Sequence, residues 1–175
     1  MILGAARACL ERDGALNLRE VADRLHVRTP SLYEYFPSLD ALREELVRAG
    51  FIMLGEELRA AAKRERSLLF IGRAYRMFVK HHPRLYHLMR EPGTGRIRGH
   101  AIGQFVIQPI ADILNIRVDD PGFLPVSRIL WSFVHGFVTL EQAGQFFAGG
   151  DLDRTFETGI RALAASREIR KPPRS

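Results

Sequence analysis

Short hydrogen-bonding side chains gather between residues 28 and 35 of this 175-residue chain. Arg28, Thr29 and Ser31 offer guanidinium and hydroxyl groups, and Tyr33 and Tyr35 follow at once. An arginine can read guanine in bidentate fashion, a threonine methyl can meet a thymine methyl, and hydroxyl groups bind phosphate oxygens. The chemistry that this segment favours is recognition of a nucleic acid.

Two short amphipathic helices are needed to position these side chains. Asn17 precedes an apolar stripe at helical spacing over 18–25, and Glu20 makes a capping box plausible. Pro30 is typical of the first turn of a short third helix over 31–36. Its inner side would be formed by Val27, Leu32 and Phe36. Periodicity alone leaves open whether this pair is a helix-turn-helix or a generic helical hairpin.

The rest of the chain also has helical periodicity, and no strand with convincing alternation is found, so the expected fold class is all-α. Further helices are expected over 2–13, after an N-cap at Ser38, over 54–80 with a break near Glu65, over 83–89, over 105–114, over 126–147 up to Gly149-Gly150, and after an N-cap at Asp151. Residues 92–103 and 119–125 are expected to be loops.

Composition excludes several classes of protein. Hydrophobic residues make up 46% of the chain and charged residues 26%, which is ordinary for a globular protein. The single cysteine, Cys9, excludes an intrachain disulfide and a cysteine-based zinc site. No apolar run approaches the ~18 residues of a membrane span, and the N-terminus does not resemble a signal peptide. We therefore expect a cytoplasmic protein with no membrane partner.

The net charge of +6 suggests an anionic partner, but the excess charge lies in the middle of the chain. Residues 1–48 contain seven arginines against eight acidic residues, whereas residues 49–100 contain eleven basic residues against four acidic ones.

The stretch LREVADRLHVRTPSLYEYFPSLDAL, residues 18–42, resembles the DNA-binding domain of the TetR family of bacterial repressors. The match centres on residues 27–33. A shorter match at 131–136, WSFVHG, resembles the Trp-His-Gly signature of one TetR ligand-binding subclass. The resemblance implies a helix-turn-helix domain over 1–48, a helical effector-binding and dimerisation domain over 49–168, and a flexible tail over 169–175.

The resemblance also implies roles for single residues. Arg28, Thr29 and Ser31 match positions that usually face base edges. Tyr33, Asn17 and Arg19 match positions that usually contact phosphates. The full DNA-binding set expected is Asn17, Arg19, Arg28, Thr29, Pro30, Ser31, Tyr33 and Tyr35. The chain departs from the family in opening its first helix at Met1 without a basic arm and in having Leu39 where a lysine is frequent.

Aromatic residues after position 49 are candidates either for the core or for a cavity that binds a small apolar effector. Trp131 and His135 share one helical face, although a buried histidine is more often a core residue than a ligand contact. The candidate pocket residues are Phe78, His82, Tyr86, Met89, Phe105, Trp131 and His135.

The last two helices are apolar around much of their circumference, which favours a two-fold homodimer over a monomer. The interface residues expected are Phe137, Leu140, Gly144, Phe156 and Ile160.

No catalytic constellation is found, and we expect no enzyme activity, no cofactor and no metal site. Three nearby histidines, His81, His82 and His87, are better explained as a solvated helix end than as metal ligands. The expected function is a transcriptional repressor that binds a pseudo-palindromic operator as a homodimer and releases it when a small apolar effector binds. The alternative is a helical small-molecule-binding module with weak or vestigial DNA binding, which the acidic balance of residues 1–48 favours.

Overall fold

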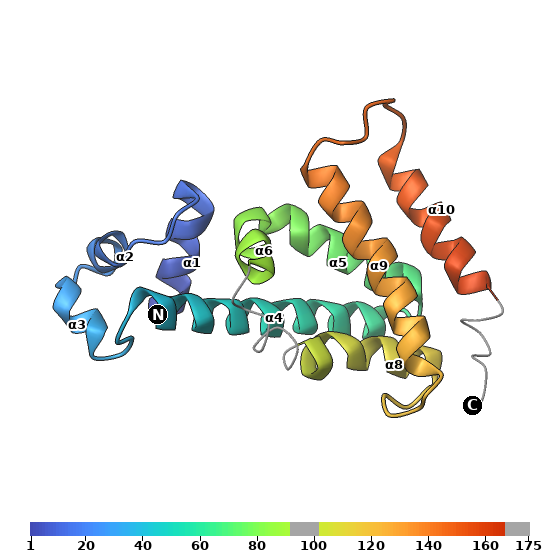
Figure 1. Cartoon of the computed structure of the whole chain (residues 1–175), viewed down its shortest axis with the longest axis horizontal. Coiled ribbons are helices and arrows are strands. Elements are labelled where there is room, and N and C mark those ends of the chain that lie inside the picture. The colour runs from blue at the N-terminus through green and yellow to red at the C-terminus, as the bar shows by residue number, and fades with distance from the viewer. Residues whose placement is uncertain (92–101, 167–175) are drawn as a thin grey trace. The chain divides into compact units, whose positions relative to one another are not determined.

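The computed structural model describes residues 1–91 and 102–166. These residues form helices and connecting turns with no strand (Figure 1), which confirms the all-α class. The chain forms two compact units. The first unit combines Met1–Met53 with His82–Ile102, and the second combines Leu54–His81 with the residues from Gly103 onward.

The first unit contains four short elements and the first part of a long helix. They are α1 (Ile2–Asp13), α2 (Leu18–Leu25), α3 (Thr29–Tyr33), α6 (Pro83–Arg90) and the N-terminal turns of α4 (Leu39–Arg64). Helix α1 packs against both α2 and α6, and α2 packs against α3. The core of this unit contains several small side chains, which let the short helices approach closely. The completely buried residues include Ala6, Cys9, Val21, Ala22 and Leu42.

Side-chain caps start the helices where the sequence predicts them. The Oδ1 atom of Asn17 accepts a hydrogen bond from the backbone N–H of Arg19 at 2.9 Å, and the Oγ atom of Ser38 accepts one from Ala41 at 3.1 Å. Both caps satisfy N–H groups that the helix leaves without partners. The Asn17 bond reaches Arg19 rather than Glu20, so it is not the reciprocal capping box that the spacing suggested.

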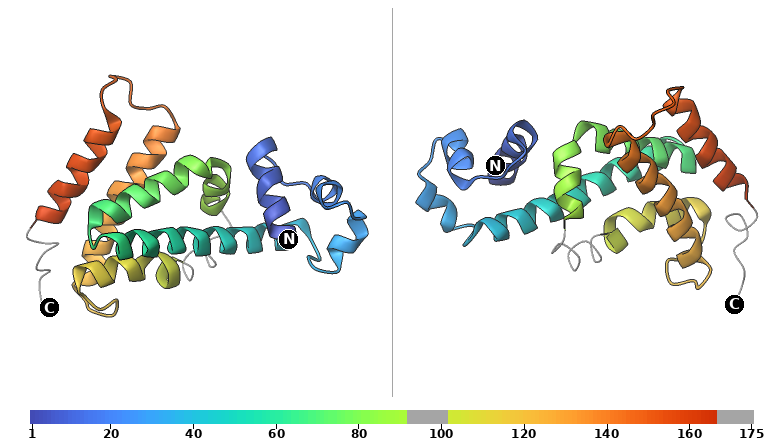
Figure 2. Two further views of the ribbon diagram at one scale, coloured as in Figure 1. Left: turned by 180° about the vertical axis from the view of Figure 1, so that it is seen from behind. Right: turned by 45° about the horizontal axis from the view of Figure 1, so that its top comes forward.

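The second unit contains the rest of α4, then α5 (Leu68–His81), the π-helix η1 (Ile102–Ile107), α8 (Gln108–Leu114), α9 (Phe123–Gln142) and α10 (Leu152–Ala165). Helix α5 packs against α8, α9 and α10, and α9 packs against α10, as the views in Figure 2 let the reader follow. Phe78, Phe123, Phe156, Leu58 and Ile160 fill the core.

Close approach of α9 and α10 depends on Gly159, because a Cβ atom there would overlap the Phe133 ring. The N-cap predicted for α10 is confirmed, since the Asp151 Oδ1 atom accepts from the Arg154 N–H at 2.9 Å. The predicted break near Glu65 is also confirmed, because α4 ends at Arg64 and α5 begins at Leu68.

Helix α9 begins and ends earlier than the sequence predicted. It starts at Phe123, inside the expected loop, and ends at Gln142, five residues short of Phe147. Gly144 adopts the left-handed conformation with φ of 63°, and two backbone bonds close the last turn, from the Gly144 N–H to Glu141 and from the Gln145 N–H to Leu140. This Schellman arrangement ends the helix. The apolar spacing continues to residue 147, so periodicity alone did not indicate where the helix ends.

Helix α9 also corrects the expectation that no apolar run is long enough to span a membrane, because by length and composition alone it qualifies. Its buried residues, among them Val126, Leu130 and Val138, belong to the face that packs with α5 and α10. This is the behaviour of a core helix in a helical domain.

Of the loop expected over 92–103, residues 92–101 lie outside the described residues and the last two belong to η1. The expected tail over 169–175 also lies outside them.

Candidate nucleic-acid interface and helical cavity

Helices α2 and α3 are joined by a tight turn of three residues. His26 ends α2 in the left-handed conformation with φ of 56°, and the Val27 N–H donates to the Ala22 carbonyl at 3.0 Å. Arg28 then has extended backbone and serves as the N-cap position of α3. Leu32 is 2% exposed and fixes the inner side of α3. Two packed helices with this short turn form a helix-turn-helix, whose second helix can enter a major groove.

The candidate DNA-binding side chains differ in their exposure. Arg28, Tyr33 and Tyr35 are exposed, and Thr29 and Ser31 are half-buried. Asn17 and Arg19, also exposed, lie at the N-terminus of α2. Pro30 is exposed in the first turn of α3, a position where its missing N–H costs no hydrogen bond.

The third helix is shorter than predicted. It ends at Tyr33, so Tyr35 and Phe36 lie beyond it. Val27, expected on the inner side, is 43% exposed, because it belongs to the turn rather than to the helix. Leu32 is buried as the periodicity required.

The second unit encloses an apolar cavity of about 30 Å³. Its walls come from α4, α5, η1, α8, α9 and α10 and are formed by Leu58, Leu68, Ile71, Gly72, Tyr75, Val106, Ile110, Leu130, Trp131, Val134 and Ile160. The Tyr75 and Trp131 rings meet edge to face with centroids 5.7 Å apart. The space suffices for roughly two water molecules, so a larger guest would have to move the walls apart.

Of the seven predicted pocket residues, Trp131 lines this cavity. His135 stacks on the Trp131 ring at 5.3 Å between centroids, and Phe78 is completely buried in the core. Phe105 lies under the guanidinium of Arg59. His82, Tyr86 and Met89 belong to the first unit, so the seven residues are divided between the two units.

Tyr75 is a cavity residue that the sequence analysis missed. Leu68, Ile71, Gly72 and Tyr75 all line the cavity and follow each other on α5 at i, i+3, i+4 and i+7. That stripe was visible in the sequence, but it is equally typical of an ordinary core face.

Three of the five residues expected at a subunit interface lie inside the single chain. Phe137 is 7% exposed, Phe156 is completely buried and Ile160 is 1% exposed, because these side chains form the α5–α9–α10 core. Gly144 lies beyond the end of α9. Leu140, by contrast, is 40% exposed on the outer side of α9.

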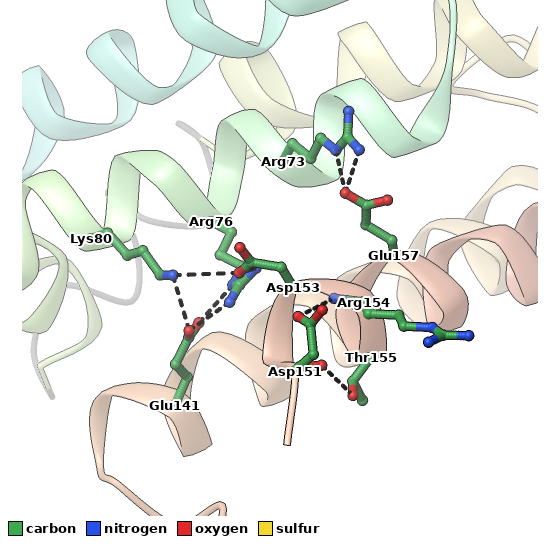
Figure 3. A network of polar contacts seen from close by, with 9 residues as sticks. All are labelled: Arg73, Arg76, Lys80, Glu141, Asp151, Asp153, Arg154, Thr155 and Glu157. Carbon is green, nitrogen blue, oxygen red and sulfur yellow. Dashed lines mark hydrogen bonds and ion pairs between the residues drawn. The ribbon is translucent and has the colours of Figure 1, made fainter. Parts of the chain in front are cut away.

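An ion-pair cluster fastens α5 to α9 and α10 (Figure 3). The buried Arg76 guanidinium donates to both Glu141 oxygens at 2.7 and 2.6 Å and pairs with Asp153 at 2.7 Å. It also lies over the Phe137 and Phe156 rings. Hydrogen bonds from Arg76, and then from Lys80, lower the pKa of Glu141, while the bond to Glu141 raises the pKa of Arg76. The sequence could not reveal this cluster because Arg76 and Glu141 are 65 residues apart in the chain.

Models of one protein family match most of this chain. The model for the bacterial regulatory proteins of the tetR family matches residues 2–46, and that for the C-terminal domain of tetracyclin repressor-like proteins matches residues 68–163. The chain belongs to the TetR family. It is therefore a helix-turn-helix transcriptional regulator, a member of a family that binds DNA and is not enzymatic.

Individual relatives are similar to this chain in sequence or in fold. The chain is 29% identical over 177 residues to the uncharacterised HTH-type transcriptional regulator Rv0681 of Mycobacterium tuberculosis, covering 97% of this chain and 81% of that protein. A solved TetR-family regulator from Streptomyces coelicolor superimposes with a TM-score of 0.72 at 19% identity, covering 96% and 85% of the two chains. A TetR variant from Acinetobacter baumannii, solved in complex with minocycline, has a TM-score of 0.61 at 21% identity, covering 94% and 92%.

Among the residues that the structure describes, no group of three histidine, cysteine or acidic side chains could hold a metal ion.

Proposed function

We propose that this TetR-family regulator is a ligand-responsive repressor that binds a pseudo-palindromic operator as a homodimer and releases it on binding an effector. The observation that carries the proposal is the helix-turn-helix of α2 and α3, with the exposed hydrogen-bonding side chains of Arg28 and Tyr33 at the two ends of α3. In this proposal residues 1–48 form the DNA-binding domain and residues 49–168 the regulatory domain, and the protein works in the cytoplasm.

Base reading is assigned to the start of α3. Arg28, Thr29, Pro30 and Ser31 would face the base edges, and Tyr33, Tyr35, Asn17 and Arg19 would hold the phosphates. Arg28 and Tyr33 are both exposed, as groove and backbone contacts require. The Asn17 side chain is engaged as a cap, which leaves its amide nitrogen for a phosphate oxygen.

The effector is proposed to be a small, uncharged, apolar molecule that enters the cavity beside Trp131. No charged side chain is among the lining residues, so a charged guest would lose its hydration without compensation. Because the cavity is small, binding would displace helices that line it and shift the population toward a conformation that no longer fits the operator. The A. baumannii relative was solved with minocycline, which is a precedent for small-molecule binding in this fold.

The C-terminal domain is further proposed to be of the Trp-His-Gly type. The nearly parallel stack of Trp131 and His135, with Gly136 next in the chain, supports this assignment.

The homodimer is proposed to form through the outer face of α9. Ile129 and Leu140 are exposed apolar residues on one stripe of that helix, and Ser132 and Gly136 lie between them. A Cβ atom on Gly136 would meet nothing within 4 Å, so this position is open in the single chain. Small residues flanked by apolar ones let two helices approach closely across a two-fold axis.

The test is a gel-shift experiment with a library of genomic promoter fragments, followed by addition of uncharged apolar compounds. We expect a sequence-dependent shift that an active compound abolishes. The same compound should change the fluorescence of Trp131, the single tryptophan of the chain. A protein that binds such compounds but shifts every fragment equally would be a small-molecule-binding module without operator recognition.

A further inference from the structure

A basic hollow lies on the second unit, separate from the apolar cavity. It has a volume of about 320 Å³ and is formed by the end of α4, the following turn and α8. Its walls are Arg59, Ala62, Lys63, Arg66, Pro109, Asp112 and Ile113. None of these residues lines the cavity beside Trp131.

Three cations line this hollow, and two of them are held in place by neutral groups. The Arg66 Nη2 atom donates to the backbone carbonyl of Asp112 at 2.6 Å, and the Arg59 guanidinium lies 5.9 Å from the centre of the Phe105 ring. Neutral partners orient a guanidinium without cancelling its charge. Within residues 1–91 and 102–166, neither Arg59, Lys63 nor Arg66 forms an ion pair with a carboxylate.

The close approach of the η1 and α4 backbones helps to fix the position of Arg59 beside the Phe105 ring. The Phe105 ring belongs to η1, which approaches α4 so closely that a Cβ atom on Gly55 would lie 2.6 Å from the Phe105 carbonyl oxygen. Since α4 carries Arg59 one turn later, the glycine sets the distance between the guanidinium and the ring.

The single carboxylate in the hollow is itself engaged. The Asp112 Oδ1 atom accepts a hydrogen bond from the Gln108 side-chain amide at 2.8 Å. The remaining walls, Ala62, Pro109 and Ile113, are apolar. The hollow therefore combines oriented positive charge with an apolar floor.

We propose that this hollow binds a small amphipathic anion, with its carboxylate or phosphate group against Arg59, Lys63 and Arg66 and a short apolar chain on the floor. Oriented guanidinium and ammonium groups recognise both kinds of anion by charge-assisted hydrogen bonds. The site also gives a role to part of the basic excess of residues 49–100, which the helix-turn-helix does not use.

The basic residues have a competing explanation, because cations near the C-terminus of α4 would stabilise its helix dipole. Arg64 separates the two explanations. It is exposed at the same end of α4 but does not line the hollow. Removing the charge of Arg64 would weaken the interaction with the helix dipole as much as removing the charge of Lys63. It would leave the walls of the hollow unchanged.

The experiment is isothermal titration calorimetry of the full chain at low salt with hexyl phosphate, hexanoate, inorganic phosphate and hexanol. We expect one saturable site per chain for hexyl phosphate, hexanoate or both, and the stronger of the two identifies the head group. Arg59→Gln and Lys63→Gln should each weaken binding about tenfold, whereas Arg64→Gln should leave it within about twofold.

Three results would overturn the proposal. The first is the absence of saturable binding by either amphipathic anion. The second is an equal loss in Arg64→Gln, which would leave a general charge effect. The third is displacement of the bound amphipathic anion by hexanol or by inorganic phosphate with equal affinity, because then either the charge or the apolar floor contributes nothing. Circular dichroism of the three variants, all at residues of the helix surface, checks that each is folded.

Discussion

Arg76 and Arg28 have contrasting environments in this protein. Arg76 is buried, and its three nitrogens are occupied by Glu141 and Asp153. Arg28 is exposed at the start of α3 and forms no ion pair within the described residues. The first arrangement stabilises a fold, and the second leaves a guanidinium available for a guanine edge or a phosphate. Local charge pairing thus distinguishes a structural arginine from one that is available for binding, whereas residue type does not.

We predict that Arg28→Ala relaxes discrimination at one base pair of the operator at a cost of about 1–3 kcal/mol, because a bidentate base contact is lost. Tyr33→Phe is the matched comparison, since it removes a hydroxyl group that would donate to a phosphate oxygen. It should weaken binding to all operator variants about equally. Quantitative gel shifts with single-base operator variants measure both, and an unchanged ranking of variants with Arg28→Ala would refute the base-reading role.

Glu141→Gln should destabilise the protein by about 2 kcal/mol near neutral pH, because Arg76 would remain buried with a weaker partner. Pairing lowers the pKa of Glu141 in the folded state. Its contribution is therefore fully present above the unfolded pKa of about 4.3 and is lost as pH falls through the folded pKa. Urea unfolding at a series of pH values should show the difference between wild type and variant shrinking below about pH 4. A difference that stays constant down to about pH 2 would contradict this account of the pair.

At the scale of the elements, helix starts with a side-chain cap could be predicted from the sequence. Helix ends that depend on backbone conformation or on tertiary packing could not. Asn17, Ser38 and Asp151 marked three helix starts correctly, since capping depends on neighbours in sequence. Apolar spacing extended α9 to Phe147, because periodicity does not register the left-handed turn at Gly144. Of the predicted pocket residues, only Trp131 lines the apolar cavity, and the other walls were not among the predicted pocket residues. A stripe such as Leu68–Tyr75 has the same spacing whether its neighbours leave a space or fill it.

Helix α6 offers a test of capping by a distant residue. The Glu11 carboxylate on α1 accepts from the backbone N–H groups of Arg84 at 3.2 Å and Leu85 at 2.9 Å, in the first turn of α6. Glu11→Ala should cost about 1 kcal/mol of stability, since two N–H groups and a favourable charge at a helix N-terminus are lost. Glu44→Ala, at an exposed position of α4, is the control and should change stability by less than about 0.5 kcal/mol in urea unfolding. Equal effects in the two variants would mean that the cap contributes nothing specific.

At the scale of the whole molecule, the proposed operator recognition requires two copies of the recognition helix at a fixed separation. A dimer with two-fold symmetry should protect a pseudo-palindrome with half-site centres about 34 Å apart or a multiple of it. Binding should weaken steeply with salt, because phosphate contacts release counterions. The acidic balance of residues 1–48 predicts weak non-specific binding, which would leave discrimination to base contacts. Both the half-site spacing and the salt-dependent binding to the operator depend on the subunit interface.

Leu140→Glu is the decisive variant for that interface. The Leu140 side chain is 40% exposed in the single chain, so a glutamate there should leave the subunit folded. If α9 pairs with its two-fold mate, each dimer acquires two charges in an apolar contact, and two-fold symmetry doubles the cost. We expect a monomer in sedimentation and loss of operator binding, with the helix-turn-helix still folded around Val21 and Leu32, both buried in the first unit. Gln142→Glu, at an exposed position two residues beyond Leu140 and therefore on another face of the same helix, should leave the dimer intact. A Leu140→Glu protein with an unchanged dimer dissociation constant would place the interface on another face.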